Sequence, residues 1–395
     1  MRVSVTDIGE LLRQTSARDF DGDDTGRLAT IKEAQRLIHR LQHPTERGWE
    51  LAFENWAVLG TLQTFIDLGI FERWHAGGGG QMSLKDLCEL ARSDVDPKLV
   101  AKDFIEEVAE EQYKPTDFSL SLGDKDSLQS AWIQSGHDHF KYDGLDYLSR
   151  FLQETSYRNP VDMGNTAYRL GCPENIDFWA RCSAKPELQA SFSEMMENWT
   201  RYKTHWTDYY DSRILLSCDI DPSAPILVDV GGNRGHDISL FLERHRTDIP
   251  TGSLILQDRP EALALAEVDQ EKIRTMPHDF LTSQPVRGAR AYMFHAVFHD
   301  WSDEMSLVIL KHTAVAMKHG YSRLLIVDVV LPPTGASAFQ AGMDVSMMGI
   351  LSSKERTQGM WEKLLSGAGF RILEIWKDPK QYESVIEAEL GSPDA

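Results

Sequence analysis

Residues 294–304, FHAVFHDWSDE, place a histidine where an apolar, strand-like run gives way to polar residues. A neutral imidazole, with a reference pKa of about 6.5, can take a proton from a hydroxyl group. It does so best when an acceptor fixes its other nitrogen, and the chain offers Asp300, Asp328 and Glu355. Two interpretations of His299 stay open on this evidence. It is either a general base or a structural histidine that bonds a backbone carbonyl where a strand ends.

A glycine-rich turn in ILVDVGGNRGHDIS follows the first apolar run of the C-terminal half. Because glycine has no Cβ, Gly231, Gly232 and Gly235 let the backbone turn tightly and let a ligand come close. The dinucleotide pattern GxGxxG would need glycine where Asn233 and His236 stand, and no GK[ST] follows for a Walker loop. These differences disfavour a loop that binds phosphate.

Acidic residues stand at three successive strand ends around this turn. Asp229 could orient a cationic group, and Asp258 ends SLILQD, where an acid grips a ribose diol in this architecture. Asp279 and Phe280 follow the next run and could bind the amine and the ring of adenine. Each acid taken alone is more simply a solvated strand end. Together they predict a ligand with adenine, ribose and a cationic amino-acid tail but no phosphate, which describes S-adenosyl-L-methionine.

With this cofactor, the chemistry would be methyl transfer from a sulfonium to a hydroxyl group by in-line displacement. The enzyme must align the oxygen with the methyl carbon and take up the proton. His299 should project over the same edge of the sheet as the cofactor, so it is the candidate base. His278 and His295 are expected to be structural or to line the cofactor site.

The elements that must position these residues change character near Pro225. Beyond it, short apolar runs rich in β-branched residues alternate with helical patterns such as DISLFLERH and EMSLVILKHTAVAMKHG. That alternation predicts an α/β fold with a parallel sheet covered on both faces. Ligands of such a sheet bind beyond the carboxyl ends of its strands.

The chain up to about Leu170 is predicted to be mainly helical. A segment with no polar face at residues 49–74 is expected in a core or a subunit interface. Residues 104–112 are also interpreted as helical, and residues 112–122 as a short hairpin or loop. The other segments with helical spacing are residues 30–41, 83–91 and 176–209.

Length and composition limit the class of protein. The chain has 395 residues, of which 42% are hydrophobic and 26% charged, as in a globular protein of two or three domains. A net charge of −20 disfavours nucleic acid and acidic membranes as partners. No signal peptide, membrane-spanning run or lipidation motif is evident, so the cytosol is the expected compartment. No metal site is expected, because the cysteines lack metal-binding spacing and fit free thiols: Cys88, Cys172, Cys182 and Cys218.

Several motifs occur together in a characteristic order: DVGGNRG, LQD, MPHDF, HDWSDE, Leu331-Pro332, and KERT followed by LLSGAGF. In this combination the chain resembles the small-molecule O-methyltransferases of plant phenolic and fungal polyketide metabolism, which use S-adenosylmethionine. The resemblance implies a seven-stranded, mostly parallel, Rossmann-like methyltransferase sheet in residues 171–395. It also implies a mainly helical, winged-helix-like dimerisation domain in residues 1–170, so that the enzyme would be a cytoplasmic homodimer.

The resemblance also implies roles for individual residues. The histidine before Asp-Trp is the family's catalytic base, here His299, and Glu355 orients it. Asp328 and Asp300 complete the catalytic group. The cofactor-binding residues would be Asp229, Gly231, Gly232, Asp258, Asp279 and Phe280, with His295 in place of a lysine common in the family. The substrate-binding residues would be Trp301, Met347 and Met348, although ordinary helix packing is an equal interpretation of the two methionines.

One departure from the family lies between PKLVAKD and YKPT, where the chain lacks about one helix of the winged-helix part, near residues 103–112. This shortening bears on the packing of the N-terminal domain and on the geometry of a dimer.

Three classes of function are compatible with these features. The first is an O-methyltransferase that methylates a phenolic or enolic hydroxyl of a small aromatic, polyketide-type metabolite. The second is a related enzyme that binds S-adenosylmethionine but catalyses a dehydration or a pericyclic step. The third is a cofactor-sensing or interaction protein, which the acidic charge and the retained His299 oppose. No motif names the methyl acceptor.

Overall fold

The computed structural model describes residues 5–51, 55–92, 104–140, 147–216, 221–380 and 382–391. Contacts within the chain divide it into two compact units, Met1–Thr61 and Leu62–Ala395. The shorter unit is helical and contains α1 (Val5–Gln14), α2 (Asp24–Leu41), α3 (Pro44–Trp49) and the start of α4 (Asn55–Asp67). The boundary predicted near residue 170 falls inside the longer unit and stays a prediction.

The N-terminal helices follow the capping signals of the sequence. The helix predicted at residues 30–41 is confirmed, but α2 begins earlier because the Asp23 side chain accepts a hydrogen bond from the Gly26 N–H. The apolar segment predicted at residues 49–74 is not one helix. Its residues 52–54 lie outside the described part, and Gly69 breaks it with a φ of 69° between α4 and α5 (Ile70–Ala76). Its expected burial is confirmed at Phe71 and Trp74.

A small antiparallel sheet stands where a helix was expected at residues 104–112. That prediction is wrong, because Ile105–Ala109 forms β2 and turns back through Glu111 (φ 54°) into β3 (Gln112–Pro115). Cross-strand pairing here overrides the helix preference of the glutamates. The third strand is β1 (Met82–Ser83), and Ser83 caps α6 (Leu84–Glu89), part of the helix predicted at residues 83–91. Residues 93–103, where the predicted shortening begins, lie outside the described residues.

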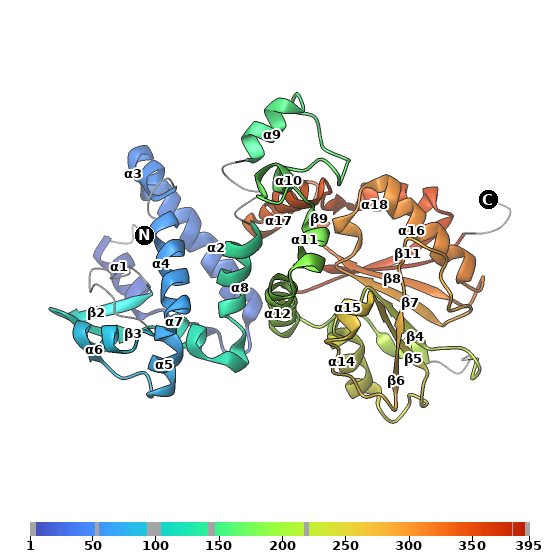
Figure 1. The fold of residues 1–395 in the computed structure, drawn as a ribbon, viewed down its shortest axis with the longest axis horizontal. Coiled ribbons are helices and arrows are strands. Elements are labelled where there is room, and N and C mark those ends of the chain that lie inside the picture. Colours follow the sequence, from blue (N-terminus) through green and yellow to red (C-terminus); the bar gives the residue numbers. More distant parts are fainter. Residues whose placement is uncertain are drawn as a thin grey trace. The chain divides into compact units, whose positions relative to one another are not determined.

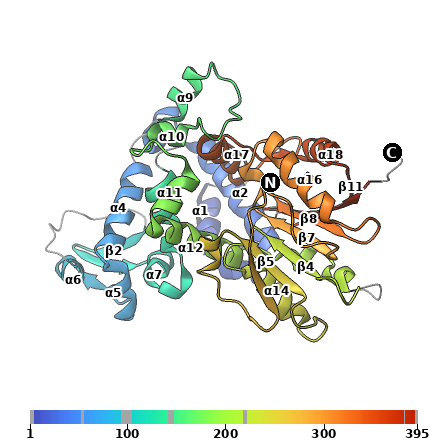
Figure 2. The same cartoon turned by 45° about the vertical axis from the view of Figure 1, so that its right-hand side comes forward.

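The longer unit contains the predicted seven-stranded sheet, with the order β11-β12-β8-β7-β4-β5-β6 (Figures 1 and 2). All neighbouring strands are parallel except those that pair with β12, which runs antiparallel to β8 and β11. Strand order reverses beside β4, and this reversal opens a crevice at the carboxyl ends of the strands. The strands are β4 (Leu227–Val230), β5 (Leu254–Asp258), β6 (Ile273–Pro277), β7 (Ala291–His295), β8 (Arg323–Asp328), β11 (Phe370–Lys377) and β12 (Ser384–Leu390).

Both faces of this sheet are covered, as the apolar strands predict. Alternate residues of β7 belong to different cores, with Tyr292 and Phe294 on one side and Ala291 and Met293 on the other. The first core is completed by α16 (Asp303–Ala316) and α18 (Gln358–Gly367), and the second by α14 (His236–His245) (Figure 1). The fold class predicted from the sequence is therefore confirmed.

Further helices precede and flank the sheet. The helical prediction for residues 176–209 is confirmed by α11 (Phe178–Ala184), α12 (Pro186–Tyr202) and α13 (Trp206–Tyr209). The remaining helices are α7 (Asp117–Gly123), α8 (Ser130–Ser135), α9 (Leu148–Glu154), α10 (Ala167–Gly171), α15 (Pro260–Leu263) and α17 (Ala338–Leu351), and two short strands are β9 (Val330–Leu331) and β10 (Arg356–Thr357).

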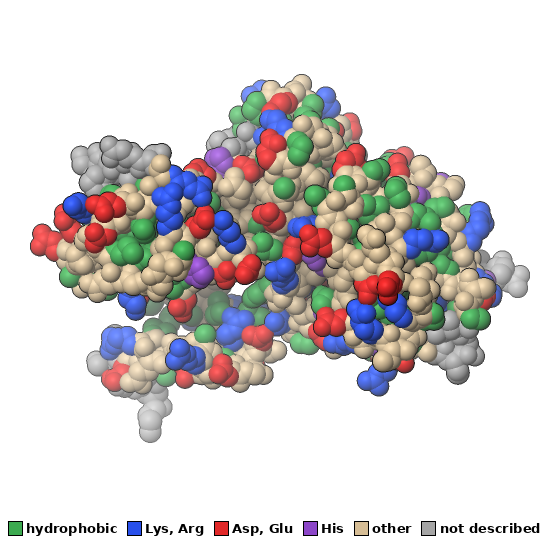
Figure 3. Space-filling view, turned by 60° about the horizontal axis from the view of Figure 1, so that its bottom comes forward, with side chains coloured by type: hydrophobic (Ala, Val, Ile, Leu, Met, Phe, Trp, Pro, Cys, Tyr) green, Lys and Arg blue, Asp and Glu red, His purple; other side chains and the backbone are tan. Residues whose placement is uncertain are grey.

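Both positively and negatively charged side chains lie on the surface of the described residues (Figure 3). On the face in Figure 3, Lys and Arg side chains are interspersed with Asp and Glu. Among the described residues, every helix is too short or too polar to cross a bilayer. Cys172 and Cys182 are buried free thiols, as predicted, and Cys218 lies outside the described residues.

Candidate active site

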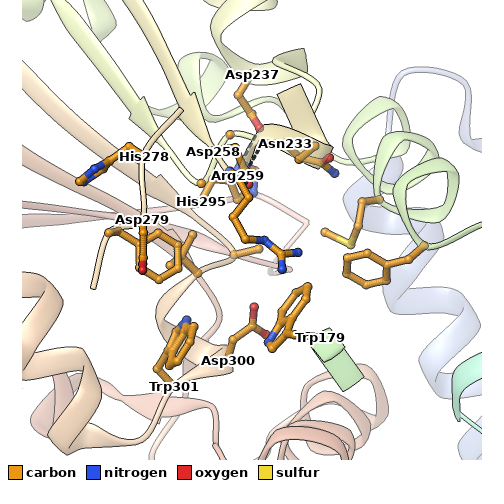
Figure 4. A pocket seen from close by; sticks show the side chains of 18 of the residues that line it. Trp179, Asn233, Asp237, Asp258, Arg259, His278, Asp279, His295, Asp300 and Trp301 are labelled. Atoms are coloured by element: carbon orange, nitrogen blue, oxygen red, sulfur yellow. Dashed lines mark hydrogen bonds and ion pairs between the residues drawn. The ribbon is translucent and has the colours of Figure 1, made fainter. Parts of the chain in front are cut away.

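A cavity of about 370 Å³ lies beyond the carboxyl ends of the central strands (Figure 4). The sheet side contributes most of the predicted cofactor residues, and α11 and α12 supply part of the opposite wall. Trp301 also lines the cavity, and its ring meets that of Phe280 edge to face with centroids 5.6 Å apart. The predicted residues that line it are Gly231, Gly232, Asp258, Asp279, Phe280, His295, Asp300 and Trp301.

The glycine turn packs too closely for larger residues. Gly231 has a φ of 76°, and a Cβ there would lie 2.9 Å from Val297 Cγ2. A Cβ on Gly232 would lie 2.5 Å from the carboxyl carbon of Asp229. The turn is tied to the end of β5, because the Asn233 N–H donates to Asp258 Oδ2 at 2.8 Å. The backbone therefore runs directly along the wall of the cavity.

Asp258 is positioned to bind a diol. Its carboxylate accepts hydrogen bonds from two backbone N–H groups, those of Asn233 at 2.8 Å and Arg259 at 2.7 Å. A carboxylate has about four acceptor sites, so capacity remains for ligand hydroxyls. Burial raises the pKa of Asp258 above its usual value.

Asp229 is buried beneath the turn and does not itself line the cavity. Its carboxylate has no hydrogen-bond partner among the described residues beyond a weak interaction with the Ile238 backbone N–H. Burial raises its pKa well above the usual range. A buried acid with so few partners beside the cavity fits a cationic tail of the predicted cofactor, reached through the backbone or a water molecule.

His295 belongs to a buried charged network at the same end of the cavity. Its Nδ1 lies 2.9 Å from Asp237 Oδ2, and its Nε2 lies 3.1 Å from Glu383 Oε2. Lys203 Nζ donates to both oxygens of Glu383 at 2.9 Å and also contacts His295. Burial lowers the pKa of His295, but Asp237 and Glu383 outweigh it and raise the pKa to about 9.

Sequence reasoning missed Lys203, Asp237 and Glu383. The first two line the cavity, and the three lie 92, 58 and 88 residues from His295. Lys203 and Glu383 stand outside the motifs, whereas Asp237 directly follows the glycine turn. The motif signalled only that the usual lysine is replaced by His295. A lysine from the end of α12 supplies a cation beside that position instead.

The predicted catalytic residues come together around His299, in a 3₁₀ turn (Phe298–Asp300) just after β7. Its Nδ1 lies 2.9 Å from Glu355 Oε1 and 4.0 Å from Asp328 Oδ1, and its Nε2 lies 3.5 Å from Asp300 Oδ1. The turn is fixed from behind by Arg356, whose guanidinium donates to the Phe298 carbonyl at 2.7 Å. Sequence positions 56 residues apart are thus joined in one cluster.

The electrostatics of this cluster favour a protonated imidazole. Burial lowers the pKa of His299, but the carboxylates of Glu355, Asp300 and Asp328 raise it well above its ordinary value. Burial also raises the pKa of Asp300 to about 6 and that of Asp328 to about 7. Asp300 lines the cavity, whereas His299, Glu355 and Asp328 are not among the lining residues.

The two methionines predicted to bind substrate lie elsewhere on α17. Met347 is buried in a cluster with Tyr168, Cys172 and Phe178, and neither Met347 nor Met348 is among the residues that line the cavity. The side chains that face the sheet across the cavity were not singled out from the sequence: Trp179, Gln189, Phe192, Met196 and Thr200. They lie on α11 and α12 at ordinary helical spacing, so no motif marks them.

Comparison with known proteins supplies the family. An O-methyltransferase domain matches residues 168–371, just over half of the chain. The chain is also 44% identical to the O-methyltransferase ATR12 of Stachybotrys chlorohalonatus, over 99% of this chain and 100% of that protein. The chain belongs to the O-methyltransferase family. It is an enzyme of the type that acts in fungal secondary metabolism, as the resemblance predicted.

Solved structures share the fold of this family member. A structure described as a pericyclic reaction enzyme has a TM-score of 0.85 at 24% identity and covers 98% of this chain and 99% of its own. OxaC in complex with SAH and oxaline has a TM-score of 0.80 at 24% identity, with 97% and 96% covered. The predicted S-adenosylmethionine cofactor is confirmed at the level of the family.

Proposed function

We propose that this enzyme transfers a methyl group from S-adenosylmethionine to a phenolic or enolic hydroxyl of a small aromatic, polyketide-type metabolite. His299 acts as the general base. The observation that supports this assignment best is the contact of His299 Nδ1 with Glu355 at 2.9 Å, which fixes the imidazole beside the cavity that contains Gly231 and Asp258. A base whose second nitrogen is held by a carboxylate is oriented for proton transfer.

The residues around the cavity would hold the cofactor in one orientation. Asp258 would bind the ribose hydroxyls, and Asp279 with Phe280 would bind adenine. The amino-acid end would lie near Asp229 and the charged network of Lys203. When bound, the cofactor supplies an electrophilic methyl group, and the protein supplies alignment and a place for the proton.

An aromatic acceptor agrees with the remaining wall of the cavity. Trp179, Phe192 and Met196 supply apolar side chains to the wall of the cavity, to which Trp301 adds a further ring. Flat aromatic ligands gain contact area from such rings, and methionine adapts to their outline. In the ligand-bound enzyme these side chains would also exclude water from the reacting oxygen.

A turnover screen tests the proposal. Phenolic polyketides are incubated with the enzyme and methyl-labelled cofactor, and a product that gains one labelled methyl group is expected. His299→Gln should lower turnover by about 10²- to 10⁴-fold while SAH still binds in calorimetry. His319→Gln, an exposed histidine bonded to the Gly391 carbonyl, is the matched control. Parental turnover in the His299 variant would contradict the assignment of the base.

The second candidate is a dehydration or pericyclic step with the cofactor bound but not consumed. The fold shared with a pericyclic reaction enzyme makes this alternative worth testing. The same labelled experiment separates the two, because only methylation converts the cofactor to SAH. Product formation without SAH would favour the second candidate.

We also propose that the enzyme acts as a homodimer in the cytosol, where thiols such as that of Cys182 stay reduced. The N-terminal helices expose a series of large apolar side chains. Leu11 on α1 is 66% exposed and Leu41 at the end of α2 is 75% exposed. Apolar side chains on one set of helices are typical of a surface that another subunit covers.

A further inference from the structure

We propose that the guanidinium group of Arg259 binds an anion in the acceptor site, and that the methyl acceptor is an aromatic hydroxy acid whose carboxylate pairs with it. This assignment rests on the methyl transfer proposed above and narrows its substrate class. The carboxylate is a second group of the acceptor, separate from the hydroxyl that is methylated. Arg259 would thus select among phenols, while His299 keeps its role as the base.

Arg259 reaches from the sheet side of the cavity to the opposite wall. It directly follows Asp258 at the end of β5, and both residues line the cavity. Its guanidinium carbon lies 5.5 Å from the centre of the Trp179 ring on α11, and its Nη1 donates to Ser183 Oγ at 3.3 Å. In Figure 4 the side chain extends into the cavity with the guanidinium group directed at Trp179. The positive charge therefore lies at the wall assigned to the acceptor.

This guanidinium has no carboxylate partner in the part of the chain that the structure describes. Its contacts there are the hydroxyl of Ser183 and the ring of Trp179. The adjacent carboxylate of Asp258 is bonded by the backbone N–H groups of Asn233 and Arg259, not by the guanidinium. A guanidinium carries five N–H donors in a planar fork, so one bond to Ser183 leaves most of them for a ligand.

Two other basic side chains near the cavity do have carboxylate partners. Lys203 donates to both oxygens of Glu383 at 2.9 Å, and Arg234 in the glycine turn lies 2.9 Å from Glu197. With 61 acidic residues for 41 basic ones, the chain has no shortage of acids that would explain the difference at Arg259. A half-buried guanidinium without such a partner is best compensated by a ligand that brings the negative charge.

The acids that line the cavity are directed to other groups. Asp237 lies 2.9 Å from His295, and Asp300 lies 3.5 Å from His299. Those at the carboxyl ends of β5 and β6 are assigned to the nucleoside of the cofactor. The donors of Arg259 are therefore left to the acceptor.

A carboxylate on an aromatic ring matches this part of the cavity better than a neutral polar group. The guanidinium fork can donate two parallel hydrogen bonds to a carboxylate, and such charge-assisted pairs are strong. Beside the cation the same wall is apolar, with Trp179 from α11 and Phe192 and Met196 from α12. A ligand that satisfies both features has an acid attached to an aromatic ring.

Binding to the enzyme loaded with SAH tests this assignment without turnover. The ligands are hydroxybenzoic and hydroxynaphthoic acids, and each acid is compared with its primary carboxamide, which keeps the shape but has no charge. In calorimetry the parent enzyme should bind an acid about 10- to 100-fold more tightly than its amide, as expected for hydrogen bonds to a charged group. Arg259→Met should abolish this preference, and Arg259→Lys, which keeps the charge but not the fork, should retain part of it. Arg246→Met is the matched control, because Arg246 pairs with Asp269 and is not among the lining residues.

Equal affinities of acid and amide for the parent enzyme would overturn the assignment, and so would a failure of every acid to bind. A preference that survives in Arg259→Met while SAH affinity falls would assign the guanidinium to the cofactor instead. Circular dichroism shows whether the variants fold.

Turnover of the same ligands with labelled cofactor separates this assignment from the proposed function. Acid-selective binding that depends on Arg259 but gives no methylated product would contradict the methyl transfer and leave the anion site in place. Methylation of the amides with the same kcat/KM as the acids would contradict only the anion site.

Discussion

The contact between Glu355 and His299 allows a sharp test of the electrostatic argument. Glu355→Gln keeps the shape of the side chain but removes the negative charge 2.9 Å from Nδ1. A hydrogen bond to a charged group contributes about 1.5–3 kcal/mol. At about 1.4 kcal/mol per factor of ten, its loss should lower the plateau of kcat by roughly 10- to 150-fold. The variant should still fold, since glutamine fills the same buried space.

The pH dependence gives the sign of the effect. In the parent enzyme the carboxylates raise the pKa of His299 above its ordinary value, so the proton-accepting form becomes available only as the pH rises through that raised pKa. The rate should therefore increase with pH, with a midpoint that belongs to the coupled pair of His299 and Asp300. Removing the Glu355 charge lowers the pKa of His299, and the midpoint should move to lower pH.

Initial rates with labelled cofactor, measured at saturating acceptor from about pH 5 to about pH 9, resolve both effects. Glu362→Gln is a suitable control, because this glutamate lies on α18 and bonds only Gln358 among the contacts described. An unchanged midpoint together with an unchanged plateau in Glu355→Gln would refute the view that this carboxylate tunes the imidazole. A lower plateau with an unmoved midpoint would show that Glu355 only orients the ring.

Four further predictions concern the cofactor site and the subunit interface. Gly232→Ala should weaken SAH binding in calorimetry by about 10- to 100-fold, because overpacking of this kind costs about 1–3 kcal/mol. Lys203→Met should lower the free energy of unfolding by up to about 3–5 kcal/mol, because it removes one of the partners of the buried Glu383, which keeps its contact with His295. Lys203→Met/Glu383→Gln should lower it by less. Folding brings His295 next to the carboxylates of Asp237 and Glu383, which raise its pKa to about 9. The protonated imidazole therefore stabilises the folded protein fully below about pH 6.5, and the melting temperature should fall as the pH rises through about 9. In light scattering, Leu11→Glu should have the mass of a monomer instead of a dimer. A mass equal to that of the parent enzyme would mean that α1 is not part of the subunit interface.

The strand ends were the most predictable part of this molecule. Apolar runs with β-branched residues mark β4, β5 and β8 directly, and an acid stands at or near the end of each. Because parallel strands end at one edge of a sheet, placing these runs also places Asp258 and Asp328 at the same rim. The geometry of the His299 cluster follows from the same rule, since Glu355 enters next to β10, which pairs with β9 beyond β8.

Two features could not be predicted from the sequence, for physical reasons. The hairpin of β2 and β3 is rich in glutamate, which favours helix in isolation, and only pairing across the strands reverses that preference. The side of His299 that faces the cavity depends on side-chain rotamers and on which nitrogen each carboxylate reaches. Residue spacing carries no such information, so the pairing of Nδ1 with Glu355 and of Nε2 with Asp300 emerges only from coordinates.

The insertion of β12 between β8 and β11 makes the end of the chain part of the active site. Glu383, just before β12, is the counter-charge of Lys203, yet it lies after residue 371, where the match to the family domain ends. A truncated protein cut at that domain limit would keep every recognisable motif, but it would lose β12, most of β11 and the counter-charge of Lys203. Expression boundaries for this enzyme should therefore be chosen so that they include the hairpin of β11 and β12.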